Sequence, residues 1–158
     1  MKERRILIVE DDPEQFRLIN EELQFAFKDV KIESIRTESD FREEVNNIIA
    51  SPPDLILMDM MLRWSLPAPP EKMPAMPEHI EEEGYYRAGI RCTKLLLEKN
   101  PQNTIPILVF TVLHHEDLEK DLNEIREEDS VFLAYLQKTA PIKKLLHEIN
   151  RIAPQLKE

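Results

Sequence analysis

Glycine is scarce in this sequence, occurring only at Gly84 and Gly89 among 158 residues. This scarcity excludes most glycine-rich phosphate loops, because such loops need several glycines to bring backbone N–H groups against the phosphates. Cysteine is scarcer still, since Cys92 stands alone and no internal disulfide can form. A lone cysteine agrees with the reducing cytosol, and we expect a cytoplasmic protein.

Long hydrophobic runs are also missing. One of the longest extends from Ile105 to Leu113 and is interrupted by Pro106 and Thr111, so it is far too short to span a bilayer. The N-terminal sequence MKERRILIVEDD is charged and has neither the apolar core nor the small-residue cleavage site of a signal peptide. The sequence therefore predicts no membrane segment.

Acidic residues outnumber basic ones along the whole chain, and the formal net charge is −10. Such a surface repels the phosphates of nucleic acids and anionic membranes. We therefore expect the partners to be proteins or metal ions, and neither nucleic acid nor membrane.

Strand-like and helix-like segments alternate along residues 1–158. Five segments are rich in β-branched or apolar residues, and each is followed by a segment with helical spacing. The strand-like segments are Arg4–Glu10, Val30–Ile35, the run DLILMDMML after Pro53, Ile105–Val112 and Val131–Leu136. Asp12 and Ser39 are candidate helix N-caps, and one helix is predicted over Gly84–Lys99. The alternation predicts a single α/β domain, in which a parallel sheet has helices on both faces.

One segment, Arg63–Glu83, breaks this pattern. It contains five prolines and no glycine, and shows neither helical nor strand periodicity. We predict an inserted loop of 21 residues, which is longer than compact domains usually hold, and such loops are often functional or disordered. Trp64, at its start, is either an anchor for the loop or a contact for a partner.

Polar side chains follow four of the predicted strands. Glu10 and Asp11 end the first strand, Asp59 the third and Thr111 the fourth, while Lys138 follows the fifth. Ligands of open α/β sheets bind at the carboxyl ends of the strands. The sequence therefore predicts that three acids, a hydroxyl and a lysine meet at one edge.

This set of groups suits phosphoryl chemistry. Clustered carboxylates form a hard-oxygen site for Mg²⁺, and a carboxylate can attack phosphorus to form an acyl phosphate. The ammonium group of Lys138 and the hydroxyl of Thr111 would then bind the phosphoryl oxygens.

Four strings, ILIVEDD, DLILMDMML, PILVFTV and YLQK, resemble in order the signature segments of response-regulator receiver domains. The resemblance covers the chain apart from the insertion. It implies a doubly wound, flavodoxin-like sheet of five strands in the order 2-1-3-4-5. It also implies that Asp59 is the phosphoacceptor, assisted by Lys138 and Thr111, and that Thr111 and Tyr135 form the switch. The metal site implied for Mg²⁺ consists of Glu10, Asp11, Asp59 and the backbone carbonyl of Met61.

The function implied by the resemblance is that of a phosphoacceptor in a two-component or phosphorelay system, not an enzyme with a separate substrate. A histidine kinase or phosphotransfer protein would supply the phosphoryl group. A downstream protein or self-association would then receive the signal. Two features depart from the family: the insertion, and the order Lys138-Thr139-Ala140-Pro141, where proline usually follows the lysine directly.

These departures leave an alternative open, a pseudo-receiver that acts as an interaction scaffold and is not phosphorylated. A phosphohydrolase with an aspartate nucleophile is disfavoured. Such enzymes need a second aspartate two residues after the first, and here that residue is Met61.

Overall fold

The computed structural model describes residues 2–128 and 133–157 and contains a five-stranded sheet in the order β2-β1-β3-β4-β5. All neighbouring strands are parallel. The strands are β1 (Arg4–Val9), β2 (Val30–Ile35), β3 (Leu55–Met58), β4 (Ile107–Thr111) and β5 (Leu133–Gln137). The predicted fold class and strand order are confirmed.

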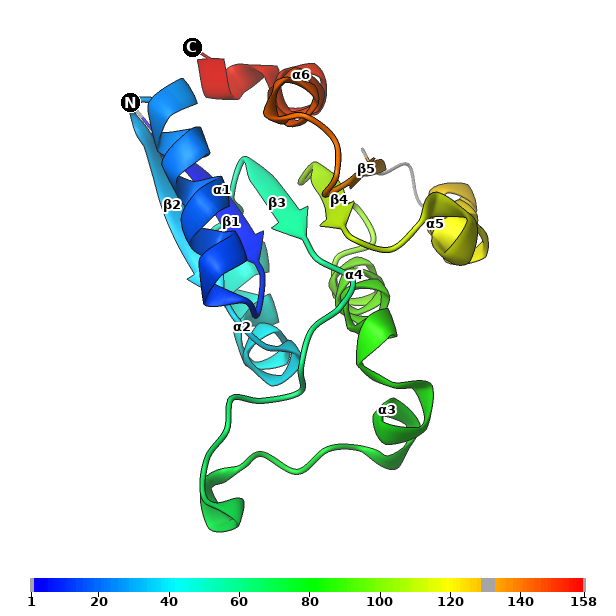
Figure 1. Ribbon diagram of the computed structural model, residues 1–158. Helices are drawn as coiled ribbons and strands as arrows, with labels where there is room; N and C mark the ends of the chain where they lie inside the picture. The colour runs from blue at the N-terminus through cyan, green and yellow to red at the C-terminus, as the bar shows by residue number, and fades with distance from the viewer. Residues whose placement is uncertain (1, 129–132, 158) are drawn as a thin grey trace.

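Helices cover both faces of the sheet (Figure 1). The helices are α1 (Pro13–Ala26), α2 (Glu38–Ala50), α3 (Glu78–Glu83), α4 (Ala88–Lys99), α5 (His115–Glu128) and α6 (Ile142–Ile152). Short 3₁₀ turns occur at η1 (Pro70–Lys72), η2 (Tyr85–Arg87) and η3 (Pro154–Lys157). One apolar cluster joins the sheet to α2, α4 and α5, and a second joins its other face to α1 and α6. Within the described residues, no helix combines the length and apolar character needed to cross a membrane.

The central strand β3 is buried on both sides. Ile56 and Met58 pack into the cluster beneath α2 and α4, whereas Leu55 and Leu57 pack into the opposite cluster. Burying each such side chain contributes about 1.5–3 kcal/mol, so the strand is held firmly. Asp59 follows directly and is therefore presented from a rigid support.

The helix starts bear on two of the sequence predictions, one confirmed and one wrong. Asp12 caps α1 as predicted, accepting hydrogen bonds from the backbone N–H groups of Glu14 at 2.9 Å and Gln15 at 3.3 Å. The prediction for Ser39 was wrong. Thr37 caps α2 by accepting the N–H of Asp40 at 3.2 Å, because the helix begins before Ser39 and contains it.

Strand boundaries differ slightly from the predicted ones. The fourth strand begins at Ile107, after Pro106, which has no N–H group to donate to a neighbouring strand. It ends at Thr111, so the predicted range Ile105–Val112 was too long. Residues 131 and 132 of the predicted fifth strand lie outside the described residues, and β5 continues to Gln137.

The insertion was predicted to be a loop throughout, but the structure shows otherwise. It holds the turn η1 and the helix α3, and it extends away from the sheet before returning to α4 (Figure 1). Pro77 precedes α3, and Ile80 within it is buried. The negative charges of Glu78 and Glu81 lie near the positive N-terminal end of the helix and stabilise it. This short helix depends on the tertiary contact of Ile80, which periodicity over six residues does not reveal.

The helix predicted over Gly84–Lys99 starts later than expected. Gly84 ends α3 with a φ of 90°, a conformation that favours glycine, and Tyr85–Arg87 form a 3₁₀ turn before α4 begins at Ala88. Gly84 therefore separates two helices and does not start one.

Candidate functional site

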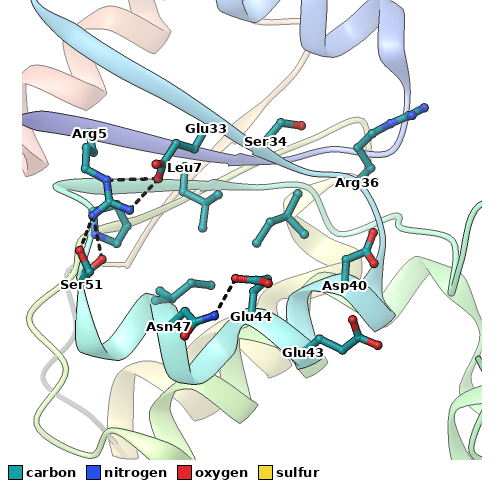
Figure 2. A pocket seen from close by; sticks show the side chains of 13 residues that line it. Arg5, Leu7, Glu33, Ser34, Arg36, Asp40, Glu43, Glu44, Asn47 and Ser51 are labelled. Atoms are coloured by element: carbon teal, nitrogen blue, oxygen red, sulfur yellow. Dashed lines mark hydrogen bonds and ion pairs between the residues drawn. The ribbon is translucent and has the colours of Figure 1, made fainter.

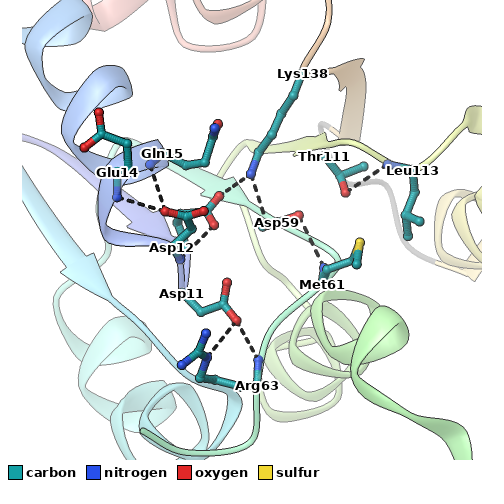
Figure 3. A network of polar contacts seen from close by, with 11 residues as sticks. Asp11, Asp12, Glu14, Gln15, Asp59, Met61, Arg63, Thr111, Leu113 and Lys138 are labelled. Atoms are coloured by element: carbon teal, nitrogen blue, oxygen red, sulfur yellow. Dashed lines mark hydrogen bonds and ion pairs between the residues drawn. The ribbon is translucent and has the colours of Figure 1, made fainter.

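Three carboxylates meet at the carboxyl edge of the sheet, as the sequence predicts (Figure 3). Glu10 and Asp11 follow β1, and Asp59 follows β3. The strands β1 and β3 are paired neighbours in the sheet. The backbone N–H of Asp59 donates to the carbonyl oxygen of Val9 at 3.0 Å, which extends the pairing to the site. One oxygen from each of the three carboxylates lies within 4.8 Å of the others.

Lys138 bridges two of these acids. Its ammonium group donates to a carboxylate oxygen of Glu10 and to Oδ2 of Asp59, the latter at 3.1 Å. The exposed fractions of the three side chains are only 8% for Lys138, 3% for Glu10 and 7% for Asp59. The backbone N–H of Lys138 donates to the carbonyl oxygen of Thr111 at 2.8 Å, and the peptide bond to Thr139 is trans.

The charges of the site influence one another strongly. Burial, and then the negative charge of Asp59, raise the pKa of Glu10 to about 7 although Lys138 opposes the rise. Burial alone would lower the pKa of Lys138, but Asp59 and Glu10 outweigh burial and raise it. Lys138 is therefore positively charged at neutral pH, and one lysine does not fully compensate the acids.

The orientation of Asp59 is fixed through both carboxylate oxygens. Oδ2 accepts from Lys138, and Oδ1 accepts the backbone N–H of Met61 at 3.3 Å. Asp59 is buried, as expected for a carboxylate at the end of an apolar strand that needs such partners. The backbone N–H of Met61 therefore contacts the Asp59 carboxylate. A metal-ligand role for the Met61 carbonyl oxygen remains a prediction.

Asp11 has a partner that sequence reasoning missed. Its Oδ2 accepts the backbone N–H of Arg63 at 3.0 Å and the Nε–H of the same residue at 3.3 Å (Figure 3). Arg63 is the first residue of the insertion, so the insertion contacts the acidic cluster at its root.

Thr111 and Tyr135 both bind Leu113. Thr111 ends β4, is fully buried, and accepts the N–H of Leu113 at 3.4 Å through its hydroxyl oxygen. Tyr135 donates its hydroxyl hydrogen to the carbonyl oxygen of Leu113 at 2.6 Å. Burial and the charge of Asp117 raise the pKa of Tyr135, so its hydroxyl remains a donor. The two predicted switch residues are therefore linked through one peptide segment.

Gly89 allows α4 to approach the site. Its N–H donates to the carbonyl oxygen of Met60 at 3.0 Å, and a Cβ atom at this position would lie 2.2 Å from the carbonyl oxygen of Asp59. Any side chain here would push the helix away from the end of β3. The sequence signal for this role is the rarity of glycine, which occurs only twice.

A groove of about 700 Å³ lies elsewhere, between β2 and α2 (Figure 2). Arg5 at one end already binds Glu33 at 2.7 Å and Ser51 at 2.8 Å. Since the groove does not include the clustered carboxylates and Lys138, volume is a poor guide to the chemistry of this protein, and we place the candidate site at Asp59.

Comparison with solved structures relates the fold to known proteins. The phosphorylated cyanobacterial phytochrome response regulator RcpA is 21% identical, with a TM-score of 0.64 over 96% of this chain and 91% of that one. The N-terminal domain of a response regulator/sensory box/GGDEF protein from Carboxydothermus hydrogenoformans is also 21% identical, with a TM-score of 0.62 over 96% and 95%. A response regulator receiver domain protein from Methanospirillum hungatei is 17% identical, with a TM-score of 0.63 over 98% and 97%.

The chain has the receiver-domain fold of response regulators. This confirms the fold that the four sequence strings predict. No protein-family model matches the chain, and no curated protein matches it in sequence. At these identities the receiver fold is what the neighbours share with this chain, and the chemistry has to be argued from its own residues.

Proposed function

We propose that this chain is a phosphoacceptor receiver domain of a two-component or phosphorelay system, phosphorylated on Asp59 with Mg²⁺. The observation that carries the proposal is the position of Lys138, which binds Glu10 and Asp59 together at the carboxyl edge of the sheet. A buried lysine between carboxylates is suited to stabilising charge that develops on a phosphoryl group.

In the proposed reaction, a carboxylate oxygen of Asp59 attacks the phosphorus of a phosphohistidine or a small acyl phosphate. A P–O bond to Asp59 forms while the bond from phosphorus to the donor's nitrogen or oxygen breaks, and the donor keeps the electron pair. Lys138 would then transfer its hydrogen bond from Oδ2 of Asp59 to a phosphoryl oxygen. The N–H of Met61 would keep the carboxylate oriented throughout.

The acidic cluster fits a divalent cation. Its donors are all carboxylate oxygens, and burial, followed by the negative charge of Asp59, raises the pKa of Glu10 to about 7. Glu10, Asp11 and Asp59 would hold Mg²⁺, with the carbonyl of Met61 as a further oxygen ligand. The cation would supply charge neutralisation for the incoming phosphoryl group.

Signalling would follow from the link between Thr111 and Tyr135. A phosphoryl group on Asp59 would attract the Thr111 hydroxyl, which now accepts from Leu113, and so shift the population of Leu113 and Tyr135 conformers. The contact surface we expect is α5, β5 and α6. A histidine kinase or phosphotransfer protein would act upstream, and a downstream protein or self-association would take the output, in the cytoplasm.

Phosphotransfer to Asp59 is tested by incubating the protein with acetyl phosphate, with and without Mg²⁺, and measuring the intact mass. The expected result is one added phosphoryl group, only with Mg²⁺, in the wild type and in Asp40→Asn, whose altered residue is exposed on α2. Asp59→Asn should gain none. An equal gain in Asp59→Asn would contradict the proposal.

The alternative function is an interaction scaffold that is never phosphorylated. The insertion and the order Lys138-Thr139-Ala140-Pro141 favour it, because both depart from the pattern of receiver domains. No mass gain with any donor at any Mg²⁺ concentration would select this alternative.

A further inference from the structure

Arg63 places a positive charge on the acidic cluster. Two of its donors, the backbone N–H and the guanidinium Nε–H, both bind Oδ2 of Asp11 (Figure 3). The Nε–Oδ2 distance is 3.3 Å, and the Arg63 side chain is 50% exposed against 19% for Asp11. The guanidinium can therefore leave for solvent more easily than the carboxylate can.

The backbone of Arg63 is fixed from the other side. The first turn of α2 donates to the insertion root, from the N–H of Glu38 to the carbonyl oxygen of Arg63 at 3.1 Å and from the N–H of Ser39 to that of Trp64 at 3.0 Å. These bonds satisfy helix N–H groups that lack partners within the helix. These hydrogen bonds hold the backbone of Arg63 beside Asp11, so the Arg63 guanidinium stays close to the carboxylate even when it does not bind it.

We propose that Arg63 is a tethered counter-cation that competes with the divalent ion for Asp11, so that metal occupancy and the insertion root are coupled. The inference rests on the metal site of the proposed function. A cation bound to Asp11 would lie close to the guanidinium of Arg63, which is 3.3 Å from the same carboxylate, and the two positive charges would repel each other. Metal binding therefore displaces the Arg63 side chain, while its backbone N–H continues to orient Asp11.

The coupling works in both directions. If metal binding weakens the contact between Arg63 and Asp11, then breaking that contact must strengthen metal binding by the same factor. A protein that binds the insertion and displaces Arg63 would thus raise the affinity for the ion. This provides a route by which the insertion acts on the phosphoacceptor site.

The neighbouring Trp64 provides an optical reporter, because it is the only tryptophan of the chain. Its ring centroid lies 5.9 Å from the guanidinium carbon of Arg42, and its Nε1–H donates to the carbonyl oxygen of Pro74 at 2.9 Å. Departure of the guanidinium of the neighbouring Arg63 would change the charge near the indole ring and hence its fluorescence. The signal comes from the insertion root and does not depend on phosphorylation.

The test compares Mg²⁺ binding by calorimetry in the wild type, Arg63→Met, Arg63→Lys and Lys72→Met. Arg63→Met keeps the apolar stem but removes the charge, and it should lower the Kd by about threefold to tenfold. Arg63→Lys should stay within about twofold of the wild type, because it keeps the charge. The control Lys72→Met removes an equal charge from exposed η1 and should leave the Kd unchanged.

The outcomes separate this inference from the proposed function. A wild type that binds no Mg²⁺ would contradict the metal site itself. If the wild type binds Mg²⁺ and Arg63→Met binds it equally or more weakly, the competition is overturned while the site stands. The tryptophan fluorescence of the wild type should also change on Mg²⁺ addition, with a smaller change in Arg63→Met, and an identical change in both would contradict the coupling.

Discussion

Tyr135 and Leu113 are joined by a hydrogen bond of 2.6 Å, in which the tyrosine hydroxyl donates to the leucine carbonyl oxygen. The N–H of the same leucine donates to Thr111 at the end of β4. The ring of His115 packs edge-on against Tyr135 at 5.1 Å between centroids. The start of α5 is therefore connected to the edge of the sheet that carries Asp59 through this aromatic contact and two hydrogen bonds in series.

Removing the tyrosine hydroxyl should weaken the resting state. We predict that Tyr135→Phe lowers the free energy of unfolding by about 0.5–1.5 kcal/mol, as expected for one hydrogen bond. The loss should be smaller with beryllium trifluoride, a stable acyl-phosphate mimic, because Thr111 would then release Leu113. Urea denaturation measures both values, and Tyr86→Phe, at a half-exposed tyrosine, is the control. Equal losses with and without the mimic would argue against a switch at Leu113.

The metal-free protein should become less stable as the pH rises through about 7. The folded-state pKa of Glu10, about 7, lies above its ordinary value of 4.5, so the folded state binds the proton more tightly. The stabilisation is fully present below about 4.5 and is lost as the pH rises through about 7. Between pH about 5.5 and about 8, the free energy of unfolding measured in EDTA should fall by on the order of 1–2 kcal/mol.

Glu10→Gln provides the control for this pH dependence, since the amide does not titrate. Its stability in EDTA should vary less over the same pH range, and Mg²⁺ should reduce the variation in the wild type. A variant with the same pH dependence as the wild type would show that another group is responsible.

The phosphorylated form should be long-lived. The resemblance to receiver domains implies that the hydrolytic water is placed by the side chains two residues after Asp59 and two after Thr111, which are Met61 and Leu113. Neither side chain can orient water by hydrogen bonding, and both are half-buried. The double change Met61→Asn and Leu113→Glu should speed hydrolysis tenfold or more, about 1.4 kcal/mol in the barrier.

Decay of the phosphorylated mass after donor removal measures this rate. Val112, which is 53% exposed, provides a comparison, because Val112→Ala changes bulk without adding a polar group. A wild-type half-life of seconds, or an unchanged rate in the double variant, would show that Met61 and Leu113 do not control water access.

The insertion should be cleaved by a nonspecific protease within residues 66–79. This stretch is largely exposed, whereas Ile80 is buried and Glu83 binds Arg91 at 3.1 Å. Trp64→Phe loses the hydrogen bond to Pro74 and should accelerate the cut, while Tyr86→Phe should not. First cleavage at another site would mean that residues 66–79 are better protected than their exposure indicates.

Sequence reasoning located the candidate site because the strand ends are visible in the hydrophobic pattern. Asp59 interrupts an apolar run, and Lys138 follows the last strand, so a parallel sheet brings them to one edge. Their hydrogen bond in the structure agrees with this placement.

The contacts that were missed involve segments distant in sequence. Arg63 is 52 positions from Asp11, and no periodicity predicts that pairing. The role of Gly89 depends on how closely α4 packs on Asp59, which is a property of the assembled fold. Likewise α3 forms because Ile80 finds a buried position, and tertiary packing of this kind outweighs local propensity.

The most direct test of the central claim is to locate the acyl phosphate. Borohydride reduces an aspartyl phosphate to homoserine, so peptide mass spectrometry after treatment with acetyl phosphate and borohydride identifies the modified residue. We predict homoserine at Asp59, only when Mg²⁺ was present, and strongly reduced in Lys138→Met, which lacks the bridging ammonium group. Homoserine at another aspartate, or at none, would contradict the account.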